Sequence, residues 1–232
     1  TSRKQAPVIH VRTRIDRPSA DVVERLGAFS SATIHEAQGR KGALSHRIKP
    51  LHPSMSFCGP AFTVKAQPGD NIMVQVAISY AQPGDVVIVE AGELEQSGSF
   101  GEVLATACQS KGLAAFVTDS GVRDSAEIIE LGFPVFSGSV CIEGTVKETL
   151  GPVNFPLAVG GQTVNPGDIL KGDADGVVVI RPEEAEDVIR ACKAREDHEA
   201  EIMAQHRAGG KTVIELHGLT EKLKAKGLLV EV

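Results

Sequence analysis

Two apolar runs in the middle of the chain, each followed by a loop and a helix-forming segment, constrain the fold most. Residues 86–89 and 113–118 have the length and composition of buried strands. The first run ends at Glu90 before a glycine-rich loop, and the second leads into a turn at residues 119–121. Because strand–loop–helix units in succession imply parallel strands joined by crossover helices, the pattern predicts a parallel βαβ core.

Two helices are expected in this stretch. The first begins at Glu102 and ends at Gly112, a residue type that commonly terminates helices. The second opens at Arg123 and Asp124 and stops at Gly132. Both preceding loops open at the carboxyl ends of parallel strands, where ligands bind in such sheets. We therefore expect Glu102, Arg123 and Asp124 to face one crevice.

The residue types in this crevice suit a small anion and a hard cation. Residues 98–101 lead into a helix start, which offers free backbone N–H groups and a partial positive charge. Arg123 adds a planar fork of donors that matches a carboxylate or phosphate. Asp124 and Glu102 offer only oxygen atoms, which suit Mg²⁺ or Mn²⁺ rather than zinc. Such a site can chelate a 2-oxo acid and stabilise a developing enolate.

A purely structural interpretation of these residues is also open. Asp124 and Ser125 can cap the helix that follows them, and Arg123 can be a solvated side chain. Glu102 is a normal residue for the first turn of a helix. The convergence of three such residues from two loops is what favours a site.

Four sequence blocks, in order, resemble one known family. They lie at residues 33–42, 69–71, 101–106 with 121–124, and 144–151. This family contains the regulator of ribonuclease activity A. It also contains the class II pyruvate aldolases that act on 4-hydroxy-4-methyl-2-oxoglutarate and 4-carboxy-4-hydroxy-2-oxoadipate. The resemblance extends over nearly the whole chain, from about Pro18 into the C-terminal helix.

The resemblance implies a fold and an assembly. The fold is α/β, a swivelling β/β/α sandwich with a parallel βαβ core and a long C-terminal helix. The assembly is a homo-oligomer, a trimer or a hexamer, with sites between subunits. We accordingly expect an α/β catalytic domain over residues 1–182. Residues 183–232 would form a helical extension that packs on a neighbouring subunit.

The resemblance also implies roles for the matching site residues. Asp124 would bind Mg²⁺ or Mn²⁺ directly, and Arg123 would hold the keto oxygen of pyruvate and stabilise its enolate. Glu102, often an aspartate in relatives, would contact a metal-bound water. Backbone amides at the helix start would hold the pyruvate carboxylate, in the segment formed by Gly101, Glu102, Val103 and Leu104.

Glu199 is the last residue that matches the family. It would reach the metal-bound waters of a neighbouring subunit. Its neighbours Glu196, Asp197 and Glu201 make the segment strongly acidic, and a solvated helix face explains such a pattern equally well. Which of these acids reaches the site stays open at this point.

These roles together imply an enzyme of aromatic-compound degradation. It would cleave 4-hydroxy-2-oxo acids by a divalent-metal-dependent retro-aldol reaction, giving pyruvate and a second oxo acid. Oxaloacetate decarboxylation uses the same enolate and is expected as a side activity. His35, Arg40 and Lys41 are the candidates for recognising the distal carboxylates of the substrate, although a buried, hydrogen-bonded role is the more expected one for His35.

A regulator that binds ribonuclease E and catalyses nothing is the alternative within the same family. That branch is typically shorter and lacks the long C-terminal helix. Residues 183–207 predict such a helix here, which favours the enzyme. A plain oxaloacetate decarboxylase is a third possibility and differs from the first only in substrate.

Composition restricts the partners and the compartment. A net charge of −6 argues against a nucleic-acid-binding surface, which would be basic and clustered. The sequence has no run of 18 apolar residues and no signal-peptide core near its start, so we expect no membrane span and a cytoplasmic location. Four scattered cysteines without a C-x-x-C pair are expected to be reduced: Cys58, Cys108, Cys141 and Cys192.

Two lysines are candidates for Schiff-base chemistry. Lys65 lies in an apolar strand, but a lysine at a strand end is usually exposed. Lys147 carries no stronger signal of its own. No covalent lysine intermediate is expected.

The tripeptide Pro-Gly-Asp occurs three times, at residues 68–70, 83–85 and 166–168. Proline followed by glycine suits a type II turn. The second and third copies are expected to precede strands. The first copy precedes an expected helix at residues 71–81, whose start would point into the crevice.

The remaining segments give a coarser prediction. Residues 19–38 favour two short helices, the second capped near residues 32–33. Residues 157–180 favour short strands around tight turns. A further helix is expected in the tail after residue 212.

Overall fold

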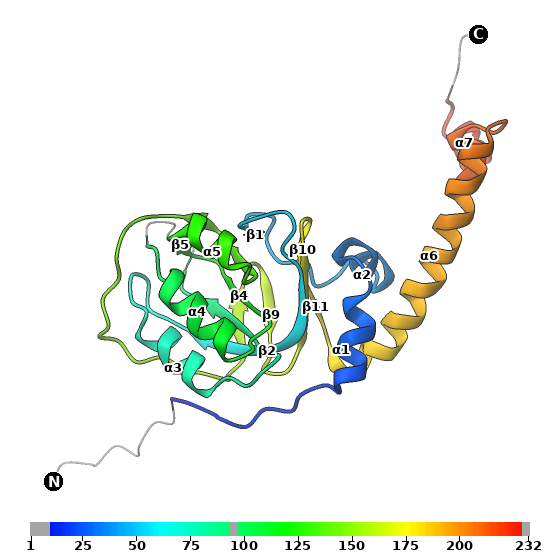
Figure 1. The fold of residues 1–232 in the computed structure, drawn as a ribbon. Helices are drawn as coiled ribbons and strands as arrows, with labels where there is room; N and C mark the ends of the chain where they lie inside the picture. Colours follow the sequence, from blue (N-terminus) through cyan, green and yellow to red (C-terminus); the bar gives the residue numbers. More distant parts are fainter. Residues whose placement is uncertain (1–9, 93–96, 229–232) are drawn as a thin grey trace.

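The computed structural model of the 232-residue chain describes residues 10–92 and 97–228. Its centre is a mixed sheet, with helices packed on it and a long arm at the C-terminal end (Figure 1). The sheet has seven strands in the order β1-β6-β4-β3-β2-β10-β11. In this order the strands are β1 (Lys49–Pro50), β6 (Val135–Ser137), β4 (Ala115–Thr118), β3 (Val86–Glu90), β2 (Phe57–Lys65), β10 (Ile169–Asp173) and β11 (Gly176–Ile180).

The middle of this sheet is the predicted parallel core. β2 pairs with β3, β3 with β4 and β4 with β6, all in parallel. β1, β10 and β11 pair antiparallel at the two ends. The apolar runs at residues 86–89 and 115–117 are fully buried, as their composition requires for strands covered on both faces. The predicted fold class, an α/β sandwich with a parallel βαβ core, is confirmed.

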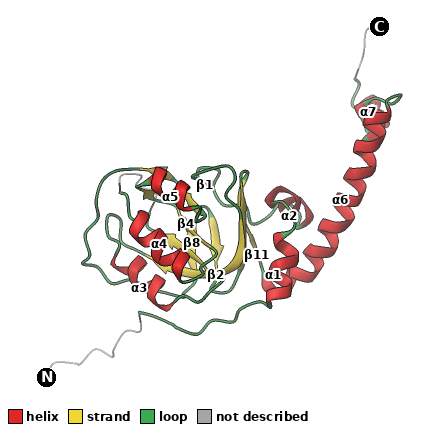
Figure 2. Ribbon diagram, viewed as in Figure 1, coloured by secondary structure: helices red, strands yellow, loops and turns green. Residues whose placement is uncertain are grey.

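Three helices make the crossovers between the parallel strands. They are α3 (Ile72–Tyr80), α4 (Glu102–Ser110) and α5 (Ser125–Leu131). The three lie side by side against the sheet (Figure 2). α4 ends at Ser110 with Lys111 as its C-cap, so Gly112, with a φ of 73°, follows the cap and terminates the helix as predicted. α5 begins one residue after Asp124, which takes the N-cap position.

Two further strand pairs complete the β structure. β5 (Gly121–Val122) pairs in parallel with β7 (Ser139–Val140), and β8 (Leu157–Val159) forms a hairpin with β9 (Gln162–Val164). Together with β10 and β11, this hairpin confirms the prediction of short strands around tight turns over residues 157–180.

The three Pro-Gly-Asp turns share one local design. Their glycines have φ values of 74° at Gly69, 87° at Gly84 and 85° at Gly167, as a type II turn requires. Asp85 Oδ2 accepts a hydrogen bond from the backbone N–H of Gln82 at 2.8 Å and so closes its turn. The turns precede β3, β10 and, in the case of Gly69, helix α3, as predicted.

The N-terminal helices pack on the long C-terminal helix. α1 (Ala20–Gly27), α2 (Ser31–Ala37) and α6 (Ala185–Ala208) share a second apolar core with β11. Ser30, not residues 32–33, caps α2, because its hydroxyl accepts a hydrogen bond from Thr33 N at 3.0 Å. All four cysteines are free thiols, as predicted.

The C-terminal arm projects away from the sandwich (Figure 1). One face of the first half of α6 is buried against α1 and α2, whereas its second half is mostly exposed. The predicted tail helix is wrong in detail: two short helices, α7 (Val213–Leu216) and α8 (Thr220–Ala225), form instead, because Gly218 breaks the segment with a φ of 63°. In the described ranges, no helix combines the length and apolar character needed to cross a bilayer.

Candidate active site

The loop between β3 and α4 and the loop between β4 and α5 are hydrogen-bonded to each other. Ser99 N donates to Gly121 O at 3.1 Å, and Arg123 N donates to Phe100 O at 2.8 Å. Phe100 is fully buried, and its ring stacks on Phe116 of β4 with 3.8 Å between the centroids. This buried ring fixes the first loop to the sheet, so the second loop is aligned along it.

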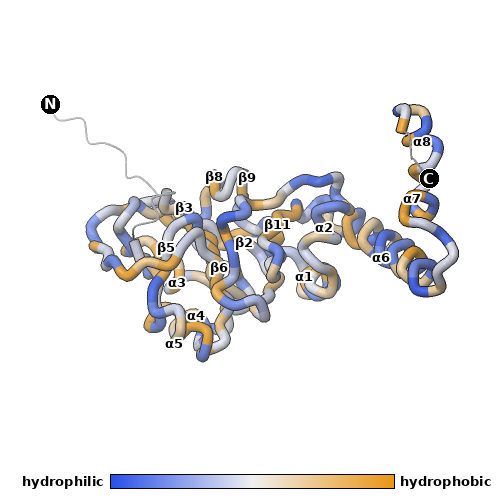
Figure 3. Tube along the Cα trace, turned by 90° about the horizontal axis from the view of Figure 1, so that it is seen from above, coloured by the Kyte–Doolittle hydropathy of each residue, from blue (hydrophilic) through white to orange (hydrophobic). Residues whose placement is uncertain are grey.

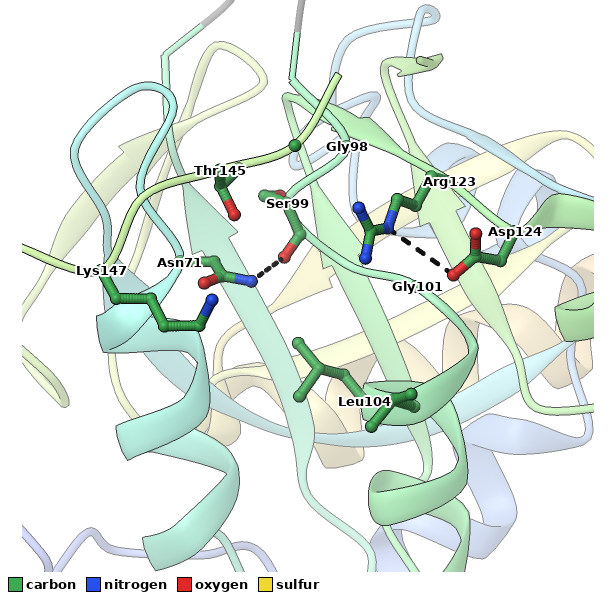
Figure 4. Close-up of a pocket in the computed structure, with 11 residues that line it drawn as sticks. Asn71, Gly98, Ser99, Gly101, Leu104, Arg123, Asp124, Thr145 and Lys147 are labelled. Carbon is green, nitrogen blue, oxygen red and sulfur yellow. Dashed lines mark hydrogen bonds and ion pairs between the residues drawn. The ribbon is translucent and has the colours of Figure 1, made fainter. Parts of the chain in front are cut away.

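These two loops enclose a small cavity of about 160 Å³ (Figure 4). Five residues predicted from the sequence line it: Gly101, Val103, Leu104, Arg123 and Asp124. The expected convergence of the two loops at the carboxyl ends of β3 and β4 is therefore present in the fold.

Asp124 has an unusual backbone and an unexpected side-chain partner. Its φ of 55° and ψ of 42° place it in the left-handed region, which aspartate tolerates better than most residues. Its side chain makes no capping bond to α5. Instead, Oδ2 accepts a hydrogen bond from the backbone N–H of Glu102 at 3.1 Å. The purely capping interpretation of Asp124 is therefore wrong, because the carboxylate is turned towards the start of α4.

Gly101 makes this arrangement possible. A Cβ atom at position 101 would overlap Asp124 Oδ2 and would lie 3.2 Å from Arg123 Cγ. Any larger residue would therefore displace the carboxylate from the start of α4.

Arg123 extends its guanidinium into the cavity (Figure 4). Its Nε lies 3.7 Å from Asp124 Oδ2, an ion-pair distance that is too long for a hydrogen bond. About half of the side chain is exposed, at 48%. The fork of N–H donors is thus available for an anionic ligand.

Glu102 contributes its backbone more directly than its side chain. Its N–H binds Asp124, and its neighbours Gly101 and Val103 line the cavity. The residue itself is exposed and does not line the cavity. Glu102 is the first residue of α4, directly after the lining residue Gly101.

Glu199 lies far along the chain from this cavity, on the exposed half of α6. Its Oε1 is 2.8 Å from Arg195 Nε, and both residues line a separate cavity of about 480 Å³. Within one chain, Glu199 therefore does not line the cavity around Asp124. Its expected reach into a neighbouring subunit stays a prediction.

The residues expected to recognise distal carboxylates also lie elsewhere in the same chain. His35 lines another cavity, of about 260 Å³, beside β11. Its Nδ1 is 2.9 Å from Lys41 O, and Arg40 Nε donates to Glu36 at 3.1 Å. None of the three lines the cavity around Arg123.

Four other side chains complete the cavity: Asn71, Ser99, Thr145 and Lys147. The start of the helix at residue 71 was expected to point into the crevice, and Asn71 does line it. No role in the site was predicted from the sequence for the other three side chains. Asn71 Nδ2 donates to Ser99 O at 3.0 Å, which ties the start of α3 to the loop before α4. Three of these residues, Asn71, Thr145 and Lys147, lie in the blocks at 69–71 and 144–151 that carried the family resemblance. These blocks could have pointed to the residues on this side of the cavity, although a block does not indicate which of its residues face the site.

The donor set of the cavity fits a hard divalent cation that keeps most of its water. Asp124 supplies a partly exposed carboxylate. Among the residues the structure describes, no three His, Cys, Asp or Glu side chains gather into a protein-only metal cage. Mg²⁺ is commonly held by one or two carboxylates, with water and substrate oxygens completing its shell. Mg²⁺ or Mn²⁺ therefore fits Asp124.

Known proteins share both the sequence and the fold. The RraA-like family, described as Aldolase/RraA, matches residues 19–179. A Halalkalibacterium halodurans protein provisionally named 4-hydroxy-4-methyl-2-oxoglutarate aldolase is 32% identical over 203 residues. That match covers 88% of this chain and 95% of the relative.

Solved structures agree with the sequence match. Streptomyces coelicolor RraAS2, described as an unusual member of the RNase ES inhibitor RraA protein family, superposes with a TM-score of 0.73 at 27% identity. The match covers 83% of this chain and 100% of that chain. A Pseudomonas syringae protein with a TM-score of 0.75 at 24% identity, covering 88% of this chain and 100% of its own, shows the same fold. The chain belongs to the RraA-like family.

Proposed function

We propose that this protein is a divalent-metal-dependent lyase. It would cleave 4-hydroxy-2-oxo acids, such as 4-hydroxy-4-methyl-2-oxoglutarate and 4-carboxy-4-hydroxy-2-oxoadipate, to pyruvate and a second oxo acid in aromatic-compound degradation. One observation supports this most: the Arg123 guanidinium, the Asp124 carboxylate and the start of α4 border the same small cavity. The name of the Halalkalibacterium halodurans relative supports the same reaction class.

The start of α4 suits the carboxylate of the 2-oxo acid. The first bond inside this helix runs from Ala105 N to Gly101 O at 3.0 Å. The N–H groups of Val103 and Leu104 lie in the turn before it, where a helix leaves its amides without a partner in the helix. Both residues line the cavity. A carboxylate placed there would also benefit from the positive end of the helix dipole.

Arg123 suits the keto oxygen. When the C3–C4 bond of the substrate breaks, its electron pair moves into the pyruvyl half and negative charge collects on that oxygen. The guanidinium is oriented into the cavity before the reaction, so its donors need little reorganisation as the charge develops. A Mg²⁺ or Mn²⁺ ion held by Asp124 would act as a Lewis acid on the bound oxo acid.

The C4 hydroxyl must lose its proton as the bond breaks. Glu102 stands beside the lining residues Gly101 and Val103 and would accept this proton through a water molecule. Glu199 of a neighbouring copy would assist it. The same pyruvyl intermediate forms when oxaloacetate loses carbon dioxide, so decarboxylation is the expected side reaction.

Pyruvate release, coupled to lactate dehydrogenase, tests the proposal across a panel of oxo acids. Removal of divalent ions with EDTA should abolish turnover, and Mg²⁺ or Mn²⁺ should restore it. Arg123→Ala should lower retro-aldol cleavage and oxaloacetate decarboxylation together, each by about 100-fold or more. Turnover that survives EDTA, together with a lysine adduct trapped by borohydride and pyruvate, would contradict the metal mechanism.

A ribonuclease regulator is the second candidate, because Streptomyces coelicolor RraAS2 is described as a member of an RNase inhibitor family. Capture of ribonuclease E by the purified chain, with no pyruvate formed from any oxo acid in the panel, would favour this candidate over the enzyme.

We also infer a homo-oligomer, a trimer or a hexamer, in which the arm after residue 183 packs on a neighbouring subunit. Hydrophobic and hydrophilic residues alternate along α6 (Figure 3). Large apolar side chains are exposed along the arm, among them Met203 at 48% and Val213 at 60%. Burial of these side chains would stabilise the assembly. Light scattering of the intact chain, compared with a chain that ends at residue 208, measures the contribution of α7 and α8.

A further inference from the structure

We propose that Lys147 forms a second anion-binding position in the cavity and selects substrates that carry a carboxylate distal to the 2-oxo acid group. This inference rests on the proposed function, because it names the substrates that the same site prefers. The comparisons and the sequence assign no role to Lys147.

Lys147 and Arg123 stand on opposite sides of the cavity, with Asn71 and Ser99 between them (Figure 4). The Lys147 ammonium makes no hydrogen bond or ion pair within the described ranges 10–92 and 97–228. Lys65 is different, because its ammonium lies 3.0 Å from the carboxylate of Glu90. The positive charge of Lys147 is therefore available to a ligand.

The backbone around Lys147 is held in place by a buried carboxylate. Asp70 is 2% exposed, and its Oδ2 accepts from Glu148 N at 2.8 Å and from Thr149 N at 2.7 Å. Its Oδ1 accepts from Ile72 N at 2.9 Å. One residue thus joins the segment that follows Lys147 to the start of α3.

The segment before Lys147 is fixed to the same turn. Val146 N donates to Gly69 O at 2.9 Å, and Asn71 N donates to Val146 O at 3.1 Å. Lys147 therefore has a backbone anchored on both sides and a long side chain that leans over the cavity (Figure 4). Only the side chain has to be ordered when a ligand binds, which limits the entropic penalty of binding.

The charges of the cavity suit a dianion better than a monoanion. Arg123 and Lys147 are cationic, and Asp124 is the acidic side chain that lines it. A divalent ion at Asp124 would add to the positive charge. If the start of α4 holds one carboxylate, then Lys147, across the cavity from Arg123, is placed to meet the other end of the molecule. Its ammonium acts as a point charge that a carboxylate can approach from several directions.

Lys147 is assigned to binding rather than to covalent catalysis. A Schiff-base lysine needs a desolvated amine or a nearby cation that favours its neutral form. Lys147 is exposed, and its segment lies on the surface of the cavity.

Two substrates that differ in one carboxylate test the proposal. Retro-aldol cleavage of 4-hydroxy-4-methyl-2-oxoglutarate gives two pyruvates, and that of 4-hydroxy-4-methyl-2-oxopentanoate gives pyruvate and acetone. The first substrate has the distal carboxylate and the second lacks it. The ratio of their kcat/KM values in the intact, metal-loaded protein measures the selectivity for that group.

Lys147→Met removes the charge and keeps the length of the side chain. We expect the ratio to fall by about tenfold, mainly through a higher KM for the dicarboxylate, because the variant cannot donate a charged hydrogen bond to the distal carboxylate. Lys147→Arg should recover most of the ratio. Lys41→Met is the matched control, because Lys41 was the competing candidate and does not line this cavity.

The outcomes separate this inference from the proposed function. A wild-type protein that forms no pyruvate from either substrate overturns the proposed function and the role of Lys147 with it. If the wild type is active, an unchanged ratio in Lys147→Met overturns only the role of Lys147. Equal losses on both substrates also overturn it, because Lys147 would then act on the half that they share. If the ratio of kcat/KM values falls in Lys41→Met and not in Lys147→Met, the distal carboxylate is bound by Lys41 instead.

Discussion

The carboxylate of Asp124 accepts a hydrogen bond from the backbone N–H of Glu102 at 3.1 Å, across 22 residues of sequence. This bond joins the start of α5 to the start of α4. It also leaves the carboxylate 39% exposed at the edge of the cavity, where its other oxygen can meet a cation. Asp124 is thus both part of the framework and the proposed metal ligand.

Asp124→Asn separates these two roles. Asparagine tolerates the left-handed backbone and keeps an oxygen acceptor for Glu102 N, so the fold should be retained. The neutral amide should bind Mg²⁺ or Mn²⁺ poorly and lower the turnover of oxo acids by about 100-fold, equivalent to a few kcal/mol. Calorimetric titration with Mn²⁺ and pyruvate-release kinetics measure both effects. Wild-type cation affinity in this variant would remove Asp124 from the metal site.

Gly101→Ala should disrupt the site by steric overlap alone. The new methyl group overlaps Asp124 Oδ2, so the carboxylate has to leave the start of α4. We expect a loss of activity and of cation affinity, together with a lower Tm. Gly27→Ala is the control for adding a methyl group away from the cavity. The added Cβ has one heavy atom within 4 Å, Cys58 Cβ at 3.3 Å, and overlaps no backbone or carboxylate atom. Normal kinetics in Gly101→Ala would show that Asp124 does not need its present position.

Asp70 should make the stability of the protein depend on acid pH. Burial by itself would raise the pKa of this carboxyl, but hydrogen bonds from Ile72, Glu148 and Thr149 outweigh burial and hold the pKa below its usual range. Because the pKa is lowered by folding, the stabilisation is complete above the unfolded value of about 4 and is lost as pH falls through the folded pKa.

Asp70→Asn tests this dependence directly. At neutral pH the variant should be less stable by about 1–3 kcal/mol, since an amide cannot accept all three backbone N–H bonds. The difference from wild type should begin to shrink as pH falls below about 4, where the carboxyl of the unfolded chain is protonated, and should disappear once pH falls below the lowered pKa of the folded protein. Urea unfolding at pH 7 and pH 3 measures it. A constant difference at both values would mean that Asp70 does not titrate as inferred.

Arg17, which is partly exposed, forms an ion pair with the buried Asp85 away from the cavity. Nε and Nη2 of Arg17 donate to the two carboxylate oxygens of Asp85 at 2.8 Å each, and Asp85 is fully buried. Arg17→Met leaves a buried carboxylate without its main partner, which should lower the free energy of unfolding by about 2–4 kcal/mol. Urea denaturation measures the loss, and the double variant with Asp85→Asn should recover part of it. A change below about 0.5 kcal/mol would contradict the importance of the pair.

The buried thiols should be unreactive in the native protein. Burial raises the pKa of Cys108 to about 12 and that of Cys192 to about 11, so both remain thiols at pH 8. Mass spectrometry after a short iodoacetamide pulse should find them unmodified until urea unfolds the chain. Rapid native labelling of Cys108 would show that the α4 region opens readily.

The sequence alone determined the central strands and helices, and it placed the two loops that carry Gly101 and Arg123 next to each other. The apolar runs at 86–89 and 113–118 are long enough for buried strands but too short for helices, which fixed the βαβ order. Because parallel strands end at the same edge of a sheet, Arg123 and Asp124 had to lie near Gly101. These inferences need only periodicity, turn residues and the geometry of parallel strands.

Only the tertiary structure decided the other side of the cavity and the direction of individual side chains. Lys147 lies in a segment without regular secondary structure, so its position depends on the bonds that the buried Asp70 makes to the segment around it. Asp124 follows the sequence pattern of a helix cap, yet its carboxylate binds Glu102 N on another helix. Such contacts join residues that are far apart in the chain. The local sequence is the same whether a side chain makes such a contact or is exposed to solvent, so it cannot predict the contact.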